Sequence, residues 1–157
     1  MKNLYILFFL ISLECFCQPI TKRELKSIIS ELIQINKNKE FSELQLIADN
    51  TDSIFYRSEK ITLYTNRFAP DKKDICRTIE MDFYPKKMVS FHDCQFCREP
   101  SNCYVTTAKT FYKYQIIEEK GQLFLLFENN YGSKKYVIIN TTRNESNRIL
   151  EIELRKV

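Results

Sequence analysis

The sequence is poor in the residues on which several common kinds of site depend. It has two glycines, one histidine and no tryptophan in 157 residues. Two glycines cannot build a glycine-rich phosphate loop, and one histidine cannot supply both ligands of an H-E-x-x-H zinc motif. Every catalytic dyad or triad that uses an imidazole would depend on His92. No dense stripe of Lys or Arg accompanies the net charge of +4, so we expect no nucleic-acid partner.

The longest apolar run lies at the N-terminus. Lys2 precedes the run Leu4–Leu13, which has the length of a signal-peptide hydrophobic region and is too short to span a membrane. Cys15 and Cys17 place small residues at the −3 and −1 positions of a cleavage site before Gln18. These features predict a secretory signal peptide that is removed.

Residues 1–17 are thus predicted to be the signal peptide, and residues 18–157 a single domain. We expect the mature chain to be secreted or periplasmic and to have no transmembrane segment. A membrane-anchored lipoprotein, acylated at Cys15 or Cys17, is the alternative, although neither cysteine follows the small residue that such signals prefer.

The mature chain opens with a well-marked helix. Thr21 and Glu24 have the spacing of a capping box, and Ile20 and Leu25 that of a hydrophobic staple. One apolar stripe with a 3.6-residue period follows, formed by Leu25, Ile28, Ile29, Leu32 and Ile33. The pattern predicts a helix over residues 21–36 that packs against a sheet.

Further along, the apolar pattern alternates with a period of two, which is typical of half-buried strands. We expect strands at residues 61–63, 75–83, 89–91, 110–118, 122–128, 134–139 and 149–155. Residues 40–52 fit either short helical turns or another strand. Glu80 and Asp82 should face solvent. The fold is therefore predicted to be mainly β with an N-terminal helix, an antiparallel meander forming a barrel or strongly curved sheet.

From Cys76 onward a series of short motifs follows a characteristic order. They are Ile79-x-Met81-x-Phe83, Val89-x-Phe91, Cys97-Arg98-Glu99-Pro100, Tyr112 with Tyr114, Gly121-x-Leu123, Tyr136-x-Ile138 and a terminal strand ending at Leu154. This half of the chain resembles small exported lipocalin-like domains of Bacteroidetes-type bacteria.

The resemblance implies a lipocalin-like barrel that binds a ligand or a partner, with no catalytic residue to carry over and no cofactor. The Gly-x-Trp of a usual first lipocalin strand is missing, since the chain has no tryptophan. A cystatin-like α+β fold, in which the helix lies across an open sheet, is the alternative.

Four cysteines remain after cleavage: Cys76, Cys94, Cys97 and Cys103. An even number in a short exported chain indicates a disulfide framework with three possible pairings. If Phe83 pairs with Lys87 in a hairpin, Cys76 lies opposite Cys94, which predicts the bridges Cys76–Cys94 and Cys97–Cys103.

Two other roles compete for the cysteines. Cys94 and Cys97 form a C-x-x-C, which a thiol–disulfide protein could use. The four cysteines with His92 could instead bind zinc, but an oxidising compartment disfavours free thiolates, so we expect no metal. His92 and Cys94 are about 6.5 Å apart along a strand, too far for a nucleophile–base pair, and His92 is expected at the surface.

Aromatic and apolar side chains supply the remaining candidate site. If the later strands are neighbours, one interior is lined by Tyr112, Tyr114, Leu123, Leu125, Phe127 and Leu150. The sequence thus predicts an exported, non-enzymatic binding module for a small hydrophobic ligand or a partner protein. A thiol–disulfide protein and a cystatin-like inhibitor are the alternatives.

Overall fold

The computed structural model describes residues 20–39, 43–65, 75–97, 102–104, 107–146 and 148–157. The predicted signal peptide, its cleavage site and the two N-terminal cysteines lie outside these residues. Within the described part of the chain, no helix has both the length and the apolar character needed to cross a membrane.

The predicted N-terminal helix is confirmed as α2 (Lys22–Asn36). Thr21 is its N-cap, and both hydrogen bonds of the capping box form between Thr21 and Glu24. Ile20 and Leu25, which have staple spacing, are both buried. The helix buries Leu25, Ile29 and Leu32 of the predicted stripe in the same apolar core as the strands, and Ile28 and Ile33 pack against that core partly buried.

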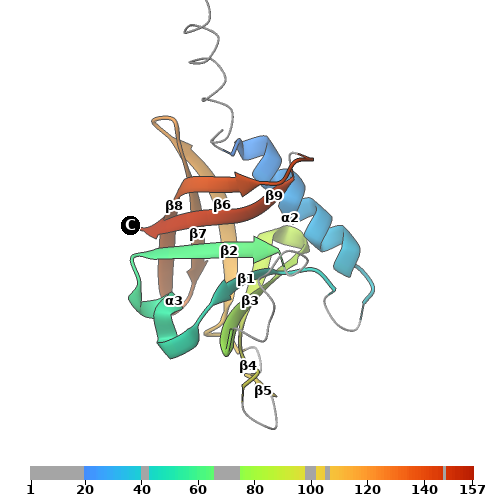
Figure 1. The fold of residues 1–157 in the computed structure, drawn as a ribbon, viewed down its shortest axis with the longest axis vertical. Helices are drawn as coiled ribbons and strands as arrows, with labels where there is room; N and C mark the ends of the chain where they lie inside the picture. The colour runs from blue at the N-terminus through green and yellow to red at the C-terminus, as the bar shows by residue number, and fades with distance from the viewer. Residues whose placement is uncertain (1–19, 40–42, 66–74, 98–101, 105–106, 147) are drawn as a thin grey trace, which may run out of the picture.

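The strands form a closed antiparallel barrel, as predicted (Figure 1). They are β1 (Leu46–Asp49), β2 (Lys60–Thr65), β3 (Arg77–Tyr84), β4 (Met88–Gln95), β5 (Asn102–Cys103), β6 (Phe111–Glu119), β7 (Gln122–Asn129), β8 (Gly132–Arg143) and β9 (Ile149–Lys156). The sheet closes because β3 pairs with both β1 and β4, while the short β5 extends one end of β4. An open, cystatin-like sheet is therefore wrong for this chain.

The order of strands departs from a strict meander at one place. From β3 to β9 the longer strands follow one another around the barrel. β1, however, lies between β2 and β3, and β2 pairs with β9. The first two strands have thus exchanged the places that a simple up-and-down order would give them.

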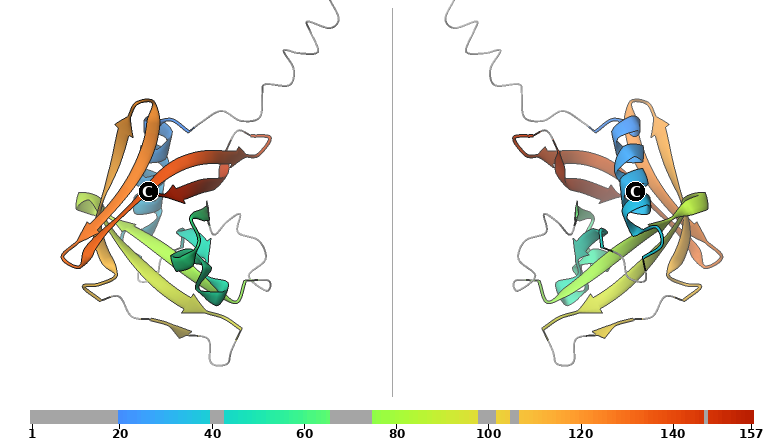
Figure 2. Two further views of the ribbon diagram at one scale, coloured as in Figure 1. Left: turned by 90° about the vertical axis from the view of Figure 1, so that its left-hand side faces the viewer. Right: turned by 90° about the vertical axis from the view of Figure 1, so that its right-hand side faces the viewer.

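A helix lies at each end of the barrel (Figures 1 and 2). α2 lies near the end where β1 and β9 begin and β2 and β8 end. The short α3 (Ile54–Arg57) joins β1 to β2 at the opposite end, after a 3-10 turn, η1 (Thr51–Ser53). Asp52 and Ser53 have positive φ, 52° and 62°, which reverses the chain before α3.

Between these helices the inner side chains pack on one another. Rings meet edge to face at centroid distances of 5.1 Å for Phe83 with Tyr114 and for Phe91 with Phe127. Phe91 also lies 5.0 Å from Tyr112. Such contacts add to the gain from burying the rings, so the aromatic residues hold the barrel together from within.

The β3–β4 hairpin does not have the predicted register. Tyr84 pairs with Met88 around the 3-10 turn η2 (Pro85–Lys87), whereas we expected Phe83 to pair with Lys87. The turn is shifted by one residue because Lys86 and Lys87 both take positive φ, 61° and 60°. A shift of one residue at the turn moves every opposed pair by two residues and leaves the inward and outward faces unchanged.

This register also shows that the predicted disulfide pairing was wrong. Cys94 pairs with Cys103 across β4 and β5, and the two form a disulfide. Cys76 lies just before β3, where its carbonyl accepts a hydrogen bond of 2.9 Å from Phe96 N–H. That contact brings Cys76 beside Cys97, with which it forms the second bridge.

The outward face of this hairpin also differs from the prediction. Glu80 and Asp82 are 9% and 7% exposed, although both were expected to face solvent. Thr78 and Ser90 on the same face are buried as well. The alternation of apolar and polar residues thus predicted on which face of β3 each side chain lies, but not that the side chains of the outer face are buried.

Candidate functional site: a cavity between α2 and the barrel

A cavity of about 280 Å³ lies between α2 and the end of the barrel. Its apolar walls come from the helix, from β1 and β2 with the residues before β1, and from the start of β9. The lining apolar residues are Ile28, Leu32, Leu44, Leu46, Leu63, Ile149, Leu150 and Ile152. The remaining wall is polar and includes Glu24, Glu31, Arg143 and Arg148.

An ion pair lies at the polar side of the cavity. Arg143 Nη2 donates to Glu24 Oε1 at 3.0 Å, which links the first turn of α2 to the end of β8. The side chain of Arg143 is 14% exposed and that of Glu24 is 39% exposed. The opposite charges of Glu24 and Arg143 thus neutralise each other at the rim of the cavity, and both side chains remain available for a polar contact with a ligand.

Glu24 serves the helix and the cavity at the same time. Its Oε2 accepts hydrogen bonds of 2.8 Å from Thr21 N–H and from the Thr21 hydroxyl. The backbone hydrogen bond is the largest effect that holds the pKa of Glu24 below its ordinary value of 4.5, and Arg143 lowers it further. Glu24 is therefore kept as a carboxylate.

The other end of α2 is fixed by its last residue. Asn36 Oδ1 accepts from the N–H groups of Glu43 and Leu44 at 2.8 and 3.1 Å, and Asn36 Nδ2 donates to the Leu44 carbonyl at 2.7 Å. These bonds tie the helix end to Leu44, which lines the cavity. Since contacts hold α2 at both ends, the cavity is part of the folded framework.

The residues predicted to bind a hydrophobic ligand divide into two groups. Tyr112, Tyr114, Leu123, Leu125 and Phe127 share one interior and belong to the packed core of the barrel. Leu150 is partly buried and lines the cavity beside α2 instead. The structure thus brings five of the six together as core and separates the sixth.

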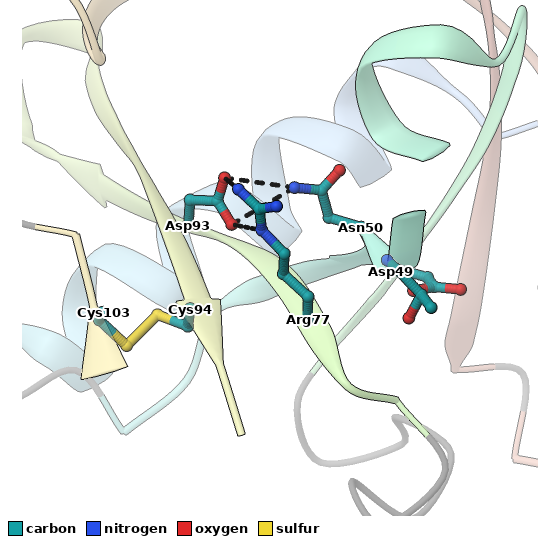
Figure 3. A network of polar contacts seen from close by, with 7 residues as sticks. Asp49, Asn50, Arg77, Asp93, Cys94 and Cys103 are labelled. Carbon is teal, nitrogen blue, oxygen red and sulfur yellow. Dashed lines mark hydrogen bonds and ion pairs between the residues drawn. A yellow bond between two sulfur atoms is a disulfide. The ribbon is translucent and has the colours of Figure 1, made fainter. Parts of the chain in front are cut away.

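A polar network is centred on Asp93, the residue before Cys94 of the Cys94–Cys103 bridge (Figure 3). Arg77 donates twice to the carboxylate of Asp93, from Nε and from Nη2, each at 2.6 Å, and this contact raises the pKa of Arg77. Asn50 Nδ2 donates to both Asp93 oxygens at 3.3 Å. Donors of the protein itself satisfy the Asp93 carboxylate, and the network joins β3 and β4 to Asn50, the residue that follows β1.

His92 lies near a serine and a carboxylate but not in the geometry of a catalytic triad. Ser90 Oγ and Asp82 Oδ2 approach the same ring nitrogen, Nε2, at 2.8 and 3.1 Å. A triad needs the two groups on different ring nitrogens, and Ser90 is fully buried. The His92 side chain is 23% exposed, so it is partly buried rather than the surface residue we expected.

The cysteines do not form the alternative sites. Cys94 and Cys97 belong to different bridges, which gives no support to a C-x-x-C redox pair. Among the described residues, no group of three or more His, Cys, Asp or Glu side chains could hold a metal ion.

Known proteins give no further guide to the site. No family model, no curated protein and no solved structure matches the chain. Sequence reasoning missed the pairing of Glu24 with Arg143, which are 119 residues apart and are brought together only in the folded chain.

Proposed function

We propose that this protein is an exported binding module for a small hydrophobic ligand, which it holds between α2 and the barrel. The observation that carries the proposal is the cavity of about 280 Å³ with apolar walls on both the helix and the strands. Its size lies near the lower end of the range of roughly 300–1,000 Å³ that is usual for small-molecule sites.

The lining accounts for the ligand class. Leu44, Leu63 and Leu150 offer apolar surface, and removing apolar ligand surface from water stabilises a complex by about 25 cal/mol per Å² before the costs of association. A polar end group on the ligand would lie at the rim, beside Glu24 and Arg143. In the barrel lumen, by contrast, side chains such as Leu125 are fully buried against one another. The cavity beside α2 is therefore the better site for a ligand.

Export is supported by two features. The N-terminal apolar run predicts a signal peptide, and two disulfides in a small domain are typical of proteins that fold in an oxidising compartment. The lipocalin-like character of the proposal comes from the motif order after Cys76 and from the barrel.

A titration with the fluorescent probe anilinonaphthalene sulfonate tests the proposal. The native protein should bind the probe saturably with a stoichiometry of about one, as expected for a single preformed cavity. Leu150→Trp should fill the cavity and abolish binding, while Val157→Trp, at a terminal residue outside the cavity lining, should bind as the wild type does. Probe binding that survives Leu150→Trp, or that begins only as the protein unfolds, would contradict it.

A further inference from the structure

At the opposite end of the barrel, the partly buried ammonium of a lysine lies among four aromatic rings. The ammonium of Lys134, on β8, lies 6.0 Å from the Phe55 ring centroid, 5.4 Å from Tyr56, 5.3 Å from Phe91 and 5.2 Å from Tyr112. All four distances are within the range of about 6 Å in which a cation is attracted to an aromatic face. We refer to these four rings as the aromatic cage.

The cage is built from three separate elements, and its rings support one another. Phe55 and Tyr56 come from α3, Phe91 from β4 and Tyr112 from β6. Phe55 contacts both Tyr56 and Phe91, at 5.3 and 6.0 Å, and Phe91 contacts Tyr112 at 5.0 Å. Three of the rings are buried, whereas Tyr56 is 47% exposed, so solvent can reach the cage on the side of Tyr56.

A primary ammonium is a poor occupant of this cage. It has three N–H donors, yet among the described residues Lys134 Nζ makes no hydrogen bond and no ion pair. Burial, with the nearby charge of Lys156, lowers the pKa of Lys134, so the four rings around the amine do not make up for the solvation it loses.

The distances also leave room around the nitrogen. A methyl carbon on the nitrogen would lie about 1.5 Å further out. From a nitrogen 5.2–6.0 Å from the ring centroids, such a carbon would reach ordinary van der Waals distance, about 3.5–4.0 Å, from the nearer rings. A methylated ammonium needs no hydrogen-bond acceptor and spreads its charge over those methyl groups.

We propose that the aromatic cage is a binding site for a quaternary ammonium group, and that Lys134 occupies it in the free protein. The four-carbon stem of Lys134 lets the amine leave the cage when such a ligand enters. The site lies at the α3 end, away from the cavity beside α2, so this proposal does not rest on the proposed function.

Choline is the probe for the test, because it carries a trimethylammonium group. Lys134→Ala should bind choline about tenfold more tightly than the wild type, since removal of an internal competitor raises the population of the open site. Lys135→Ala is the matched control: Lys135 lies over Phe124 and pairs with Glu119 outside the cage, so this variant should bind as the wild type does.

Two comparisons separate a cation site from an apolar pocket. Dimethylbutanol, in which carbon replaces the charged nitrogen of choline, should bind Lys134→Ala about tenfold more weakly than choline. Phe91→Leu in the Lys134→Ala background, folded as judged by circular dichroism, should lose most of the choline affinity. Equal binding of choline and dimethylbutanol, or no choline binding by folded Lys134→Ala, would overturn the proposal.

The wild type supplies a test that needs no variant. The ε-methylene protons of Lys134 should show upfield ring-current shifts in proton NMR, and saturating choline should move them toward the positions of an exposed lysine. If choline binds while those protons stay shifted, the cage is not its site and the proposal fails.

Discussion

Removal of the Cys76–Cys97 bridge should lower the free energy of unfolding by an amount that depends on the number of residues in the loop that the bridge closes. The cysteines are 21 residues apart, and the loop-closure relation gives about 3 kcal/mol for that separation. The same relation gives about 2.5 kcal/mol for Cys94–Cys103, 9 residues apart. Cys94 is 1% exposed, so alanine there also loses core packing, whereas Cys76 and Cys97 are exposed.

Urea unfolding of two double variants measures these energies. Cys76→Ala/Cys97→Ala should lower the free energy of unfolding by about 3 kcal/mol and the Tm by roughly 10 °C. Cys94→Ala/Cys103→Ala should cost at least as much, because packing is lost in addition to the cross-link. If either double variant unfolds at the wild-type urea concentration, the cross-link reasoning is refuted.

Thiol labelling of one single variant tests the pairing itself. Cys76→Ala should leave Cys97 as the free thiol, since these two form one bridge, and iodoacetamide should modify Cys97. Modification of Cys94 or Cys103 instead would contradict the pairing.

Three further predictions concern other parts of the chain. Leu125→Ala should cost about 2–5 kcal/mol in urea unfolding, because the side chain is fully buried in the lumen; a cost below 1 kcal/mol would mean that the interior is not packed. The pKa of Glu24 is lower in the folded protein than its ordinary value of 4.5, so Glu24 stabilises the fold at pH values above 4.5. This stabilisation is lost as the pH falls through the lower pKa of the folded state. The Tm of Glu24→Gln should therefore fall less than that of the wild type as the pH is lowered below 4.5. If the two proteins have the same dependence of Tm on pH, the Glu24 carboxylate does not stabilise the fold in this way. Intact-mass analysis of the exported protein should show a chain that begins at Gln18 without an acyl group; lipid on Cys15 or Cys17 would establish the anchored alternative.

Local patterns predicted the parts of the fold that short-range physics decides. The capping box at Thr21 and Glu24 marked the start of α2, and period-two alternation located the longer strands within a few residues. Alternation also placed Tyr112 and Leu125 in one interior, because a strand face is determined by residue parity.

Other features depend on conformations and distances that short patterns do not encode. Lys86 and Lys87 take the left-handed conformation without being residues typical of it, so the hairpin register and the disulfides were misassigned. Asp52 and Ser53 reverse the chain in the same way before α3, which no periodicity marked. The Glu24–Arg143 contact joins α2 to the end of β8 across 119 residues, a distance along the chain that no local pattern bridges.

The central claim is that a hydrophobic ligand lies between α2 and the barrel, and nuclear Overhauser effects to a bound probe test it most directly. With anilinonaphthalene sulfonate bound, the probe's aromatic protons should show cross-peaks to the methyl groups of Ile28, Leu63 and Leu150, which line the cavity. Cross-peaks to Leu125 of the lumen instead, or none to the cavity methyl groups, would contradict the account.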